Sequence, residues 1–110
     1  MRPAGLGRVV VRGRSMQPTL HDGDHLLVRY GATPRVGRLA VVHLAEDLLS
    51  VKRLTLRDPS GWWVERDNPL EGTDSWHDGA VADPDVLAVV LCRYWPLRLR
   101  RRRPRRLRDQ

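Results

Sequence analysis

One serine and one lysine are of residue types that could carry out chemistry together. Ser15 follows an apolar run and lies between Gly13 and Pro18, two residues that favour a bend in the chain. The sequence has 20 Lys and Arg residues, and Lys52 is the single lysine among them. Arginine stays protonated in proteins, whereas a desolvated lysine can become neutral and accept a proton. Ser15 and Lys52 are therefore a candidate nucleophile and general base.

A neutral lysine amine can take the proton of a serine hydroxyl as its oxygen attacks a carbonyl, and can then pass that proton to the leaving amine. Backbone N–H groups at the bend around Ser15 would stabilise the oxyanion. A competing interpretation, which the pattern alone favours, is that Ser15 caps a turn and Lys52 is a surface charge.

The elements that must position this pair are short and predict an all-β fold. Gly, Pro and Asp separate the apolar segments, and the sequence at 58–61, Asp-Pro-Ser-Gly, indicates a hairpin turn. No segment of helical length shows a sustained period of 3.6 residues. We therefore predict one all-β domain that closes on itself in a barrel-like manner. The predicted strands cover residues 9–11, 26–28, 39–44, 48–56, 62–65 and 86–92.

Lys52 lies within the predicted strand 48–56, where side chains alternate between two faces. It shares one face with Leu54 and Leu56. That face is apolar, and desolvation there would lower the pKa of the lysine amine. The strand at 39–44 is apolar enough to be buried on both faces.

Charge separates a folded domain, residues 1–96, from a basic tail, residues 97–110. The tail holds eight Arg and one Asp, which leaves 12 basic and 12 acidic residues in the domain. A formally neutral domain argues against a nucleic-acid-binding basic face. We expect a disordered tail; weak contact of the tail with anionic lipid or nucleic acid is the alternative.

At 110 residues the chain has room for one domain. A single cysteine, Cys92, excludes an internal disulfide. The N-terminus has no apolar signal region, and the longest apolar run, 86–92, is far shorter than the ~20 residues of a membrane-spanning helix. We expect a cytoplasmic monomer without a transmembrane segment, and the tail is the feature that could hold it at a membrane surface.

Two other groups of residues could carry chemistry. The segment 21–25, His-Asp-Gly-Asp-His, resembles a metal cluster, but adjacent ligands in a tight turn seldom converge, so we expect no metal and no cofactor. His43 or His77 could complete a Ser-His-Asp arrangement with Ser15. No spacing singles out either histidine, so Lys52 is preferred as the base.

Three ordered segments resemble the boxes of the type I signal peptidase family of serine proteases. Residues 13–28 carry Gly-x-Ser-Met-x-Pro-Thr-Leu-x-x-Gly-Asp-x-Leu-Leu-Val, residues 51–54 are Val-Lys-Arg-Leu, and residues 67–79 contain Asp-Asn-Pro, then Thr-Asp-Ser and a final Gly. Three boxes in order are more specific than one motif. The resemblance covers about residues 8–96. Within the family, the chain is most similar to the nickel-type superoxide dismutase maturation proteases.

The resemblance implies a Ser-Lys endopeptidase on a coiled, barrel-like β fold, with Ser15 as the nucleophile and Lys52 as the general base. It implies that the substrate lies extended between the strand before Ser15 and the strand before Lys52. The implied oxyanion hole and groove residues are Gly13, Met16, Ser50 and Val51, and the implied supports of the dyad are Asp24, Arg53, Asp67, Asn68, Asp74 and Ser75.

Three positions depart from the family pattern. Arg66 and Trp76 stand where members have glycine and arginine, and Gly72 stands where a serine normally orients the lysine amine. Either Thr73 or Ser75 substitutes for the missing hydroxyl, or activity is reduced.

The sequence therefore favours a serine endopeptidase that removes an N-terminal extension or leader from a partner protein. By resemblance, that partner is a nickel-type superoxide dismutase precursor. The alternatives are a membrane-associated signal peptidase that cleaves secretory signal peptides and a non-catalytic binding module on the same fold.

Overall fold

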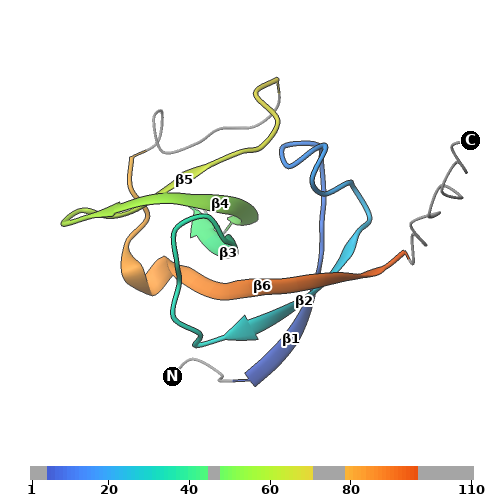
Figure 1. Ribbon diagram of the computed structural model, residues 1–110, viewed down its shortest axis with the longest axis horizontal. Coiled ribbons are helices and arrows are strands. Elements are labelled where there is room, and N and C mark those ends of the chain that lie inside the picture. Colours follow the sequence, from blue (N-terminus) through green and yellow to red (C-terminus); the bar gives the residue numbers. More distant parts are fainter. Residues whose placement is uncertain (1–4, 45–47, 71–78, 97–110) are drawn as a thin grey trace, which may run out of the picture.

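A computed structural model describes residues 5–44, 48–70 and 79–96, and these residues form an antiparallel β structure with one short 3-10 helix. The prediction of an all-β fold is confirmed, and the basic tail lies outside the described residues. Figure 1 shows the strands curling around a common interior. The elements are β1 (Gly5–Val10), β2 (His25–Tyr30), β3 (Leu39–Leu44), β4 (Leu48–Asp58), β5 (Gly61–Glu65), η2 (Asp83–Asp85) and β6 (Val86–Trp95).

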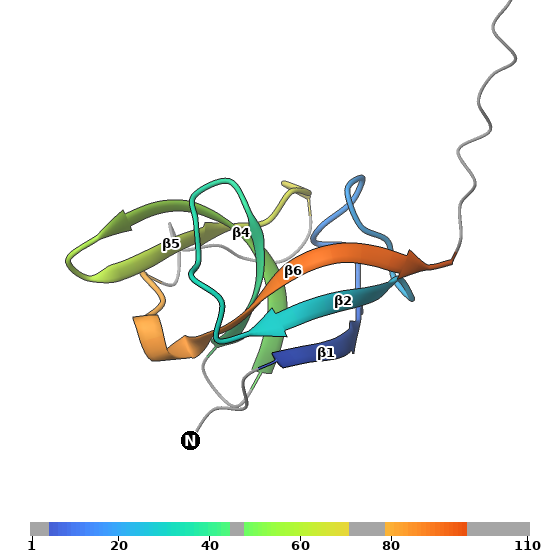
Figure 2. The same ribbon diagram turned by 60° about the horizontal axis from the view of Figure 1, so that its bottom comes forward.

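The last strand lies in the middle of the sheet. The strand order is β1-β2-β6-β3-β4-β5, and neighbouring strands pair in antiparallel fashion. β6 therefore joins the β1–β2 pair, which carries the turn with Ser15, to the β3–β4–β5 group, which carries Lys52. Figure 2 shows β6 running alongside β2 while β4 and β5 curl away from them.

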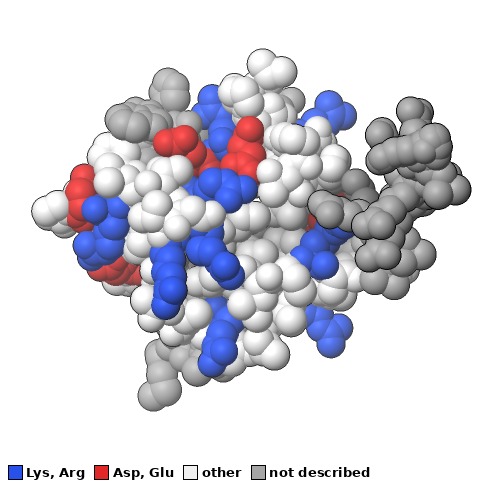
Figure 3. Space-filling view, viewed as in Figure 1, with Lys and Arg blue, Asp and Glu red and all other residues white. Residues whose placement is uncertain are grey.

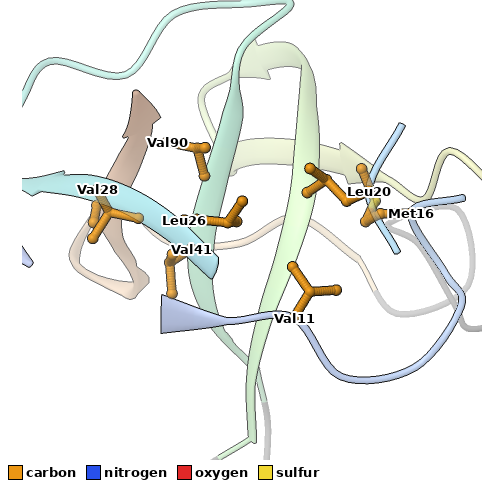
Figure 4. Close-up of a cluster of buried hydrophobic side chains, with 8 residues drawn as sticks. Val11, Met16, Leu20, Leu26, Val28, Val41 and Val90 are labelled. Carbon is orange, nitrogen blue, oxygen red and sulfur yellow. The ribbon is translucent and has the colours of Figure 1, made fainter. Parts of the chain in front are cut away.

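The interior consists of two clusters of buried side chains, and β3 contributes to both. Its Val41 packs in the first cluster, and Ala40 and Val42 pack in the second, so the central part of this strand is buried on both faces as predicted. The first cluster, shown in Figure 4, contains Val11, Met16, Leu20, Leu26, Val28, Val41, Ala88 and Val90. The second contains Ala40, Val42, Leu54, Trp62, Val64, Val81 and Val86.

A bulge in β4 corrects one prediction about its buried face. Lys52 and Leu54 are 3% and 0% exposed, but Leu56 is 48% exposed. The β4–β5 register shifts between Leu54 and Leu56, so Thr55 is an extra residue on β4. Because an extra residue reverses the side to which the following side chains point, the prediction that Leu56 shares the buried face was wrong.

The tryptophans also differ from one another. Trp62 is buried in the second cluster and Trp63 is half-buried, with its indole N–H donating to Asp58 Oδ2 at 2.8 Å. Trp95 is 54% exposed at the end of β6. β6 extends three residues beyond the predicted apolar run, to Trp95, because its last residues pair with the start of β2.

Gly61 opens β5 at a site where only glycine fits. Its φ is +129°, and a Cβ there would lie 2.4 Å from the Val81 carbonyl oxygen. Trp62 and Val81 exchange two backbone hydrogen bonds of 2.7 Å, which fixes that close approach. Gly61→Ala is therefore expected to lower the free energy of unfolding by about 2–3 kcal/mol, measured by chemical denaturation.

Gly37→Ala is the matched control, because Gly37 also has a positive φ, +90°, but a Cβ added there would meet nothing within 4 Å. We expect that change to cost about 1 kcal/mol. Equal losses in the two variants would show that the contact with Val81 is unimportant.

Candidate active site

Ser15 lies on a tight turn between β1 and β2. The Leu20 N–H donates to the Met16 carbonyl at 2.9 Å, which closes the turn. Gly13 adopts a φ of +85°, a conformation that glycine reaches without strain. Met16 and Leu20 are 1% and 5% exposed in the first cluster, whereas Ser15 is half-buried. The turn is thus anchored in the core and keeps the serine accessible.

Two aspartates that follow Ser15 hold the backbone of this turn. Asp22 Oδ1 accepts the Gly13 N–H at 2.7 Å. Asp24 is 1% exposed, and its Oδ2 accepts the His21 N–H at 2.8 Å and lies 3.9 Å from Arg93 Nη1. Within the described residues, no three His, Cys, Asp or Glu side chains gather as a metal site would require. The carboxylates of the 21–25 segment accept backbone N–H groups of the turn.

A clamp formed by Arg53, Asp67 and Thr19 joins β4, the segment after β5 and the Ser15 turn. Arg53 Nε and Nη2 donate to Asp67 Oδ1 and Oδ2 at 2.9 and 2.7 Å. Thr19 Oγ1 donates to Asp67 Oδ2 at 2.6 Å. Hydrogen bonds from Arg53 lower the pKa of Asp67, against an opposing effect of partial burial. Asp67 is therefore an ionised carboxylate that ties three segments together.

Asn68 holds the backbone carbonyls on both sides of the Ser15 Cα atom. Its N–H donates to the Ser15 carbonyl at 2.8 Å, and its Nδ2 donates to the Arg14 carbonyl at 2.9 Å. Its Oδ1 accepts the Leu70 N–H at 3.0 Å, which fixes the orientation of the amide. Asp67 and Asn68 together position the Ser15 turn against the segment that leaves β5.

Lys52 is buried in the middle part of β4, beside the point where the pairing with β5 ends. It pairs with Ala40 of β3 and lies one residue beyond the last β4–β5 pair, Arg53 with Glu65. Such burial is rare for lysine. The chain that leaves β5 at Glu65 contacts the Ser15 carbonyl through the Asn68 N–H, so it ties the Ser15 turn to this part of the sheet.

A cavity of about 300 Å³ lies beside Ser15, between β1 and β4. β1 pairs with β2 on one side only, and residues 48–52 of β4 have no partner across from β3 among the described strands. The two walls therefore present unpaired strand edges. The lining residues are Val9, Val10, Val11, Arg12, Ser15, Met16, Val41, Leu49, Ser50 and Val51.

The structure separates the candidate residues by location. Ser15, Met16, Ser50 and Val51 line the cavity, whereas Gly13 shapes the bend beside it and its N–H is occupied by Asp22. Met16 both lines the cavity and packs in the core. Arg53, Asp67 and Asn68 form the clamp and the backbone contacts that hold the turn. Asp24 is buried beside the turn and accepts a hydrogen bond from the His21 N–H.

Other candidates lie elsewhere. His43 on β3 approaches Asp85 at 3.5 Å (Nδ1 to Oδ1), and this aspartate belongs to η2 and not to the Ser15 turn. The candidates Asp74, Ser75, Gly72, Thr73, Trp76 and His77 lie outside the described residues.

The sequence interpretation missed two residues of this region, Thr19 and Arg12. Thr19 is in the first box, but its bond to Asp67 spans 48 residues and no local pattern predicts it. Arg12 lines the cavity, and its position next to Gly13, at the start of the bend, was the feature of the sequence that could have indicated this.

A comparison with protein families places the chain. The model of the family described as Peptidase S24-like matches residues 2–78, which is well over half of the chain and includes the Ser15 turn, Lys52 and the clamp. The chain belongs to the Peptidase S24-like family. This membership supports the predicted signal peptidase-like family and a serine-peptidase type of function that acts on protein; the nickel superoxide dismutase subtype stays a prediction.

No curated protein matches the S24-like chain significantly. None of the helical structure within its described residues is long and apolar enough to span a membrane.

Proposed function

We propose that this S24-like protein is a serine endopeptidase in which Ser15 is the nucleophile and Lys52 is the general base. The observation that carries the proposal is the burial of the chain's single lysine, 3% exposed, next to Arg53, which ties β4 to the Ser15 turn through Asp67 and Thr19. Burial disfavours the charged ammonium relative to the neutral amine. A neutral amine beside a serine on a bend is the arrangement that Ser-Lys hydrolysis requires.

The substrate binds as an extended segment along the unpaired edges of β1 and β4, with its scissile carbonyl at Ser15. The mechanism requires the Ser15 hydroxyl and the Lys52 amine to lie within hydrogen-bond range of each other when the substrate is bound. As Ser15 Oγ forms a bond to the carbonyl carbon, its proton passes to Lys52 Nζ. The carbonyl oxygen becomes an oxyanion, which backbone N–H groups of the turn stabilise.

Collapse of this intermediate breaks the C–N bond, and Lys52 returns the proton to the leaving amine. The acyl group stays on Ser15 as an ester. Lys52 then deprotonates a water molecule, which attacks the ester and releases the acid product with the serine restored. Throughout these steps the contacts of Asp67 and Asn68 keep the serine in position, and small displacements at such a site strongly reduce rates.

The substrate that the sequence resemblance supports is the N-terminal extension of a nickel-type superoxide dismutase precursor. The cavity beside Ser15 accommodates small to medium aliphatic side chains, because seven of its lining residues are apolar. Removal of a leader fits a site built from open strand edges, since a leader is an extended segment that can add to them.

Incubation of that precursor with the wild-type protein is expected to release one N-terminal fragment, detected by mass spectrometry. Ser15→Ala is expected to lower the rate by about 10³-fold or more, because no other group replaces the nucleophile. Ser50→Ala is the matched control, since Ser50 lines the same cavity and should change the rate only a few-fold.

Equal cleavage by the wild type and Ser15→Ala would rule out the proposed nucleophile. If the precursor stays intact while other peptides are cleaved in a Ser15-dependent manner, the substrate assignment is wrong and the mechanism stands. A failure to cleave or acylate with any peptide would favour a non-catalytic binding module.

A further inference from the structure

The cavity beside Ser15 contains one charged side chain among its lining residues, that of Arg12. Arg12 is exposed, and within the described residues it forms no hydrogen bond and no ion pair. A guanidinium at the mouth of an otherwise largely apolar cavity attracts an anionic group of whatever binds there. The charge of Arg12 is therefore available to a substrate.

The charges of the described residues around the cavity do not cancel that of Arg12. Arg14 is also exposed on the turn, and its carbonyl, not its side chain, is used by Asn68. Asp22 accepts a hydrogen bond from Gly13 and offsets one of these two cations. Asp67 is compensated by its ion pair with Arg53. Among the described residues, the rim beside Ser15 thus keeps a positive excess.

Basic side chains on the face drawn in Figure 3 are interspersed with acidic ones. Figure 3 shows Lys and Arg at several separate places on the face viewed there, with Asp and Glu among them. Arg12 is distinguished by its place on the cavity wall, so its effect should depend on the position of an anionic group in the bound peptide.

The wall that carries Arg12 is extended, so its side chains alternate. Val11 continues the antiparallel pairing beyond β1, with its N–H donating to Asp24 and its carbonyl accepting from Gly23, both at 2.8 Å. Val11 is 5% exposed, whereas Val10 is 38% exposed and Arg12 is also exposed. Val10 and Arg12 therefore lie two residues apart on the same outward side.

An extended peptide beside this wall would present its own side chains with the same period of two. One side chain would meet the apolar rim formed by Val10 and by Leu49, which is 56% exposed on the opposite wall. The side chain two residues along would meet the Arg12 guanidinium. Such a pair favours an aliphatic residue at the first position and a carboxylate at the second.

We propose that Arg12 is a specificity-determining residue, which selects peptides that carry Asp or Glu two residues from an aliphatic residue near the scissile bond. This inference rests on the proposed peptidase function for the identity of the ligand, an extended peptide. Its test uses binding, so that specificity is measured separately from cleavage.

The probe is a set of acetylated and amidated octapeptides of Ala and Val in which Asp, Asn or Lys occupies each position in turn. Fluorescence anisotropy measures their binding to the Ser15→Ala protein, which cannot turn them over. In one register, Asp is expected to bind about three- to fivefold more tightly than Asn, as for a partly exposed ion pair. This preference should shrink as ionic strength rises.

Arg12→Gln is expected to abolish the preference for Asp over Asn, and Arg12→Glu is expected to invert it in favour of Lys in the same register. Arg8→Gln is the matched control, because Arg8 is an exposed arginine of β1 outside the cavity lining. It removes the same charge and should leave the preference intact.

Equal binding of the Asp and Asn peptides at every position would overturn the inference, as would an equal effect of Arg8→Gln and Arg12→Gln. If the preference depends on Arg12 but the wild type cleaves no peptide, the proposed function fails and the specificity assignment holds. If the wild type cleaves peptides without an acidic preference, the specificity assignment fails alone.

Discussion

Lys52→Arg is expected to lower the rate of peptide cleavage by about 10²–10⁴-fold. Arginine keeps the positive charge and much of the length of the side chain, but its guanidinium does not give up a proton in a protein. The proposed mechanism needs a neutral amine at this position, which lies buried on β4 beside Ala40. The measurement is the single-turnover rate constant on a cleavable peptide.

A loss of activity in Lys52→Arg could also follow from unfolding, because a guanidinium is larger than an ammonium and this site is closely packed. Lys52→Met separates the two causes, since it removes the amine and keeps an unbranched apolar stem. We expect it to fold with a melting temperature at or above that of the wild type and to be inactive. Substantial cleavage by either variant would eliminate Lys52 as the base.

Asp67→Asn is expected to lower the cleavage rate about 10- to 100-fold, because the carboxylate ties Arg53 and Thr19 together across the Ser15 turn. It should also lower the free energy of unfolding by about 1 kcal/mol, a modest value because Arg53 is 34% exposed and solvent screens the pair. Stopped-flow cleavage and chemical denaturation measure the two effects.

The matched control is Asp83→Asn, which weakens a second bidentate pair. Arg57 Nε and Nη2 donate to Asp83 Oδ1 and Oδ2 at 3.2 and 2.6 Å, and both residues line a different cavity from the one beside Ser15. We expect that variant to cleave at the wild-type rate. A similar loss of activity in both variants would show that the effect of Asp67 is not local to the site.

The same carboxylate gives a pH dependence with a defined sign. Hydrogen bonds from Arg53 lower the pKa of Asp67 in the folded state relative to its value of about 3.9 in an unfolded chain. The stability that Asp67 contributes is therefore complete above about pH 4 and is lost as the pH falls through the lowered folded pKa. Acid titration of Asp67→Asn should show a smaller loss of stability in that range.

The local features of the fold were accessible from the sequence because they depend on near neighbours. Gly13, Pro18 and the Asp22-Gly23 pair specify the turn that carries Ser15, and alternation along β4 places Lys52 on the same face as Leu54. The bulge at Thr55 was not accessible, since it arises from the pairing of β4 with β5, and it moved Leu56 to the surface.

The contacts that assemble the candidate site are long-range, and one sequence does not display them. Asp67 and Asn68 were identified through resemblance. The hydrogen bond of Asp67 with Thr19 and that of Asn68 with the Arg14 carbonyl are seen only in the folded chain. The central place of β6 in the sheet is of the same kind, because strand order depends on pairings between distant segments.

Trapping of the acyl-enzyme tests the central claim most directly. The protein is mixed with an activated peptide ester, quenched in acid and digested with trypsin, which releases residues 15–29 as one peptide with Ser15 and Thr19 as its hydroxyl residues. The account predicts one acyl group on Ser15 in the wild type and none on this peptide in Ser15→Ala. Turnover of the ester with the acyl group on another residue, or by Ser15→Ala at the wild-type rate, would contradict it.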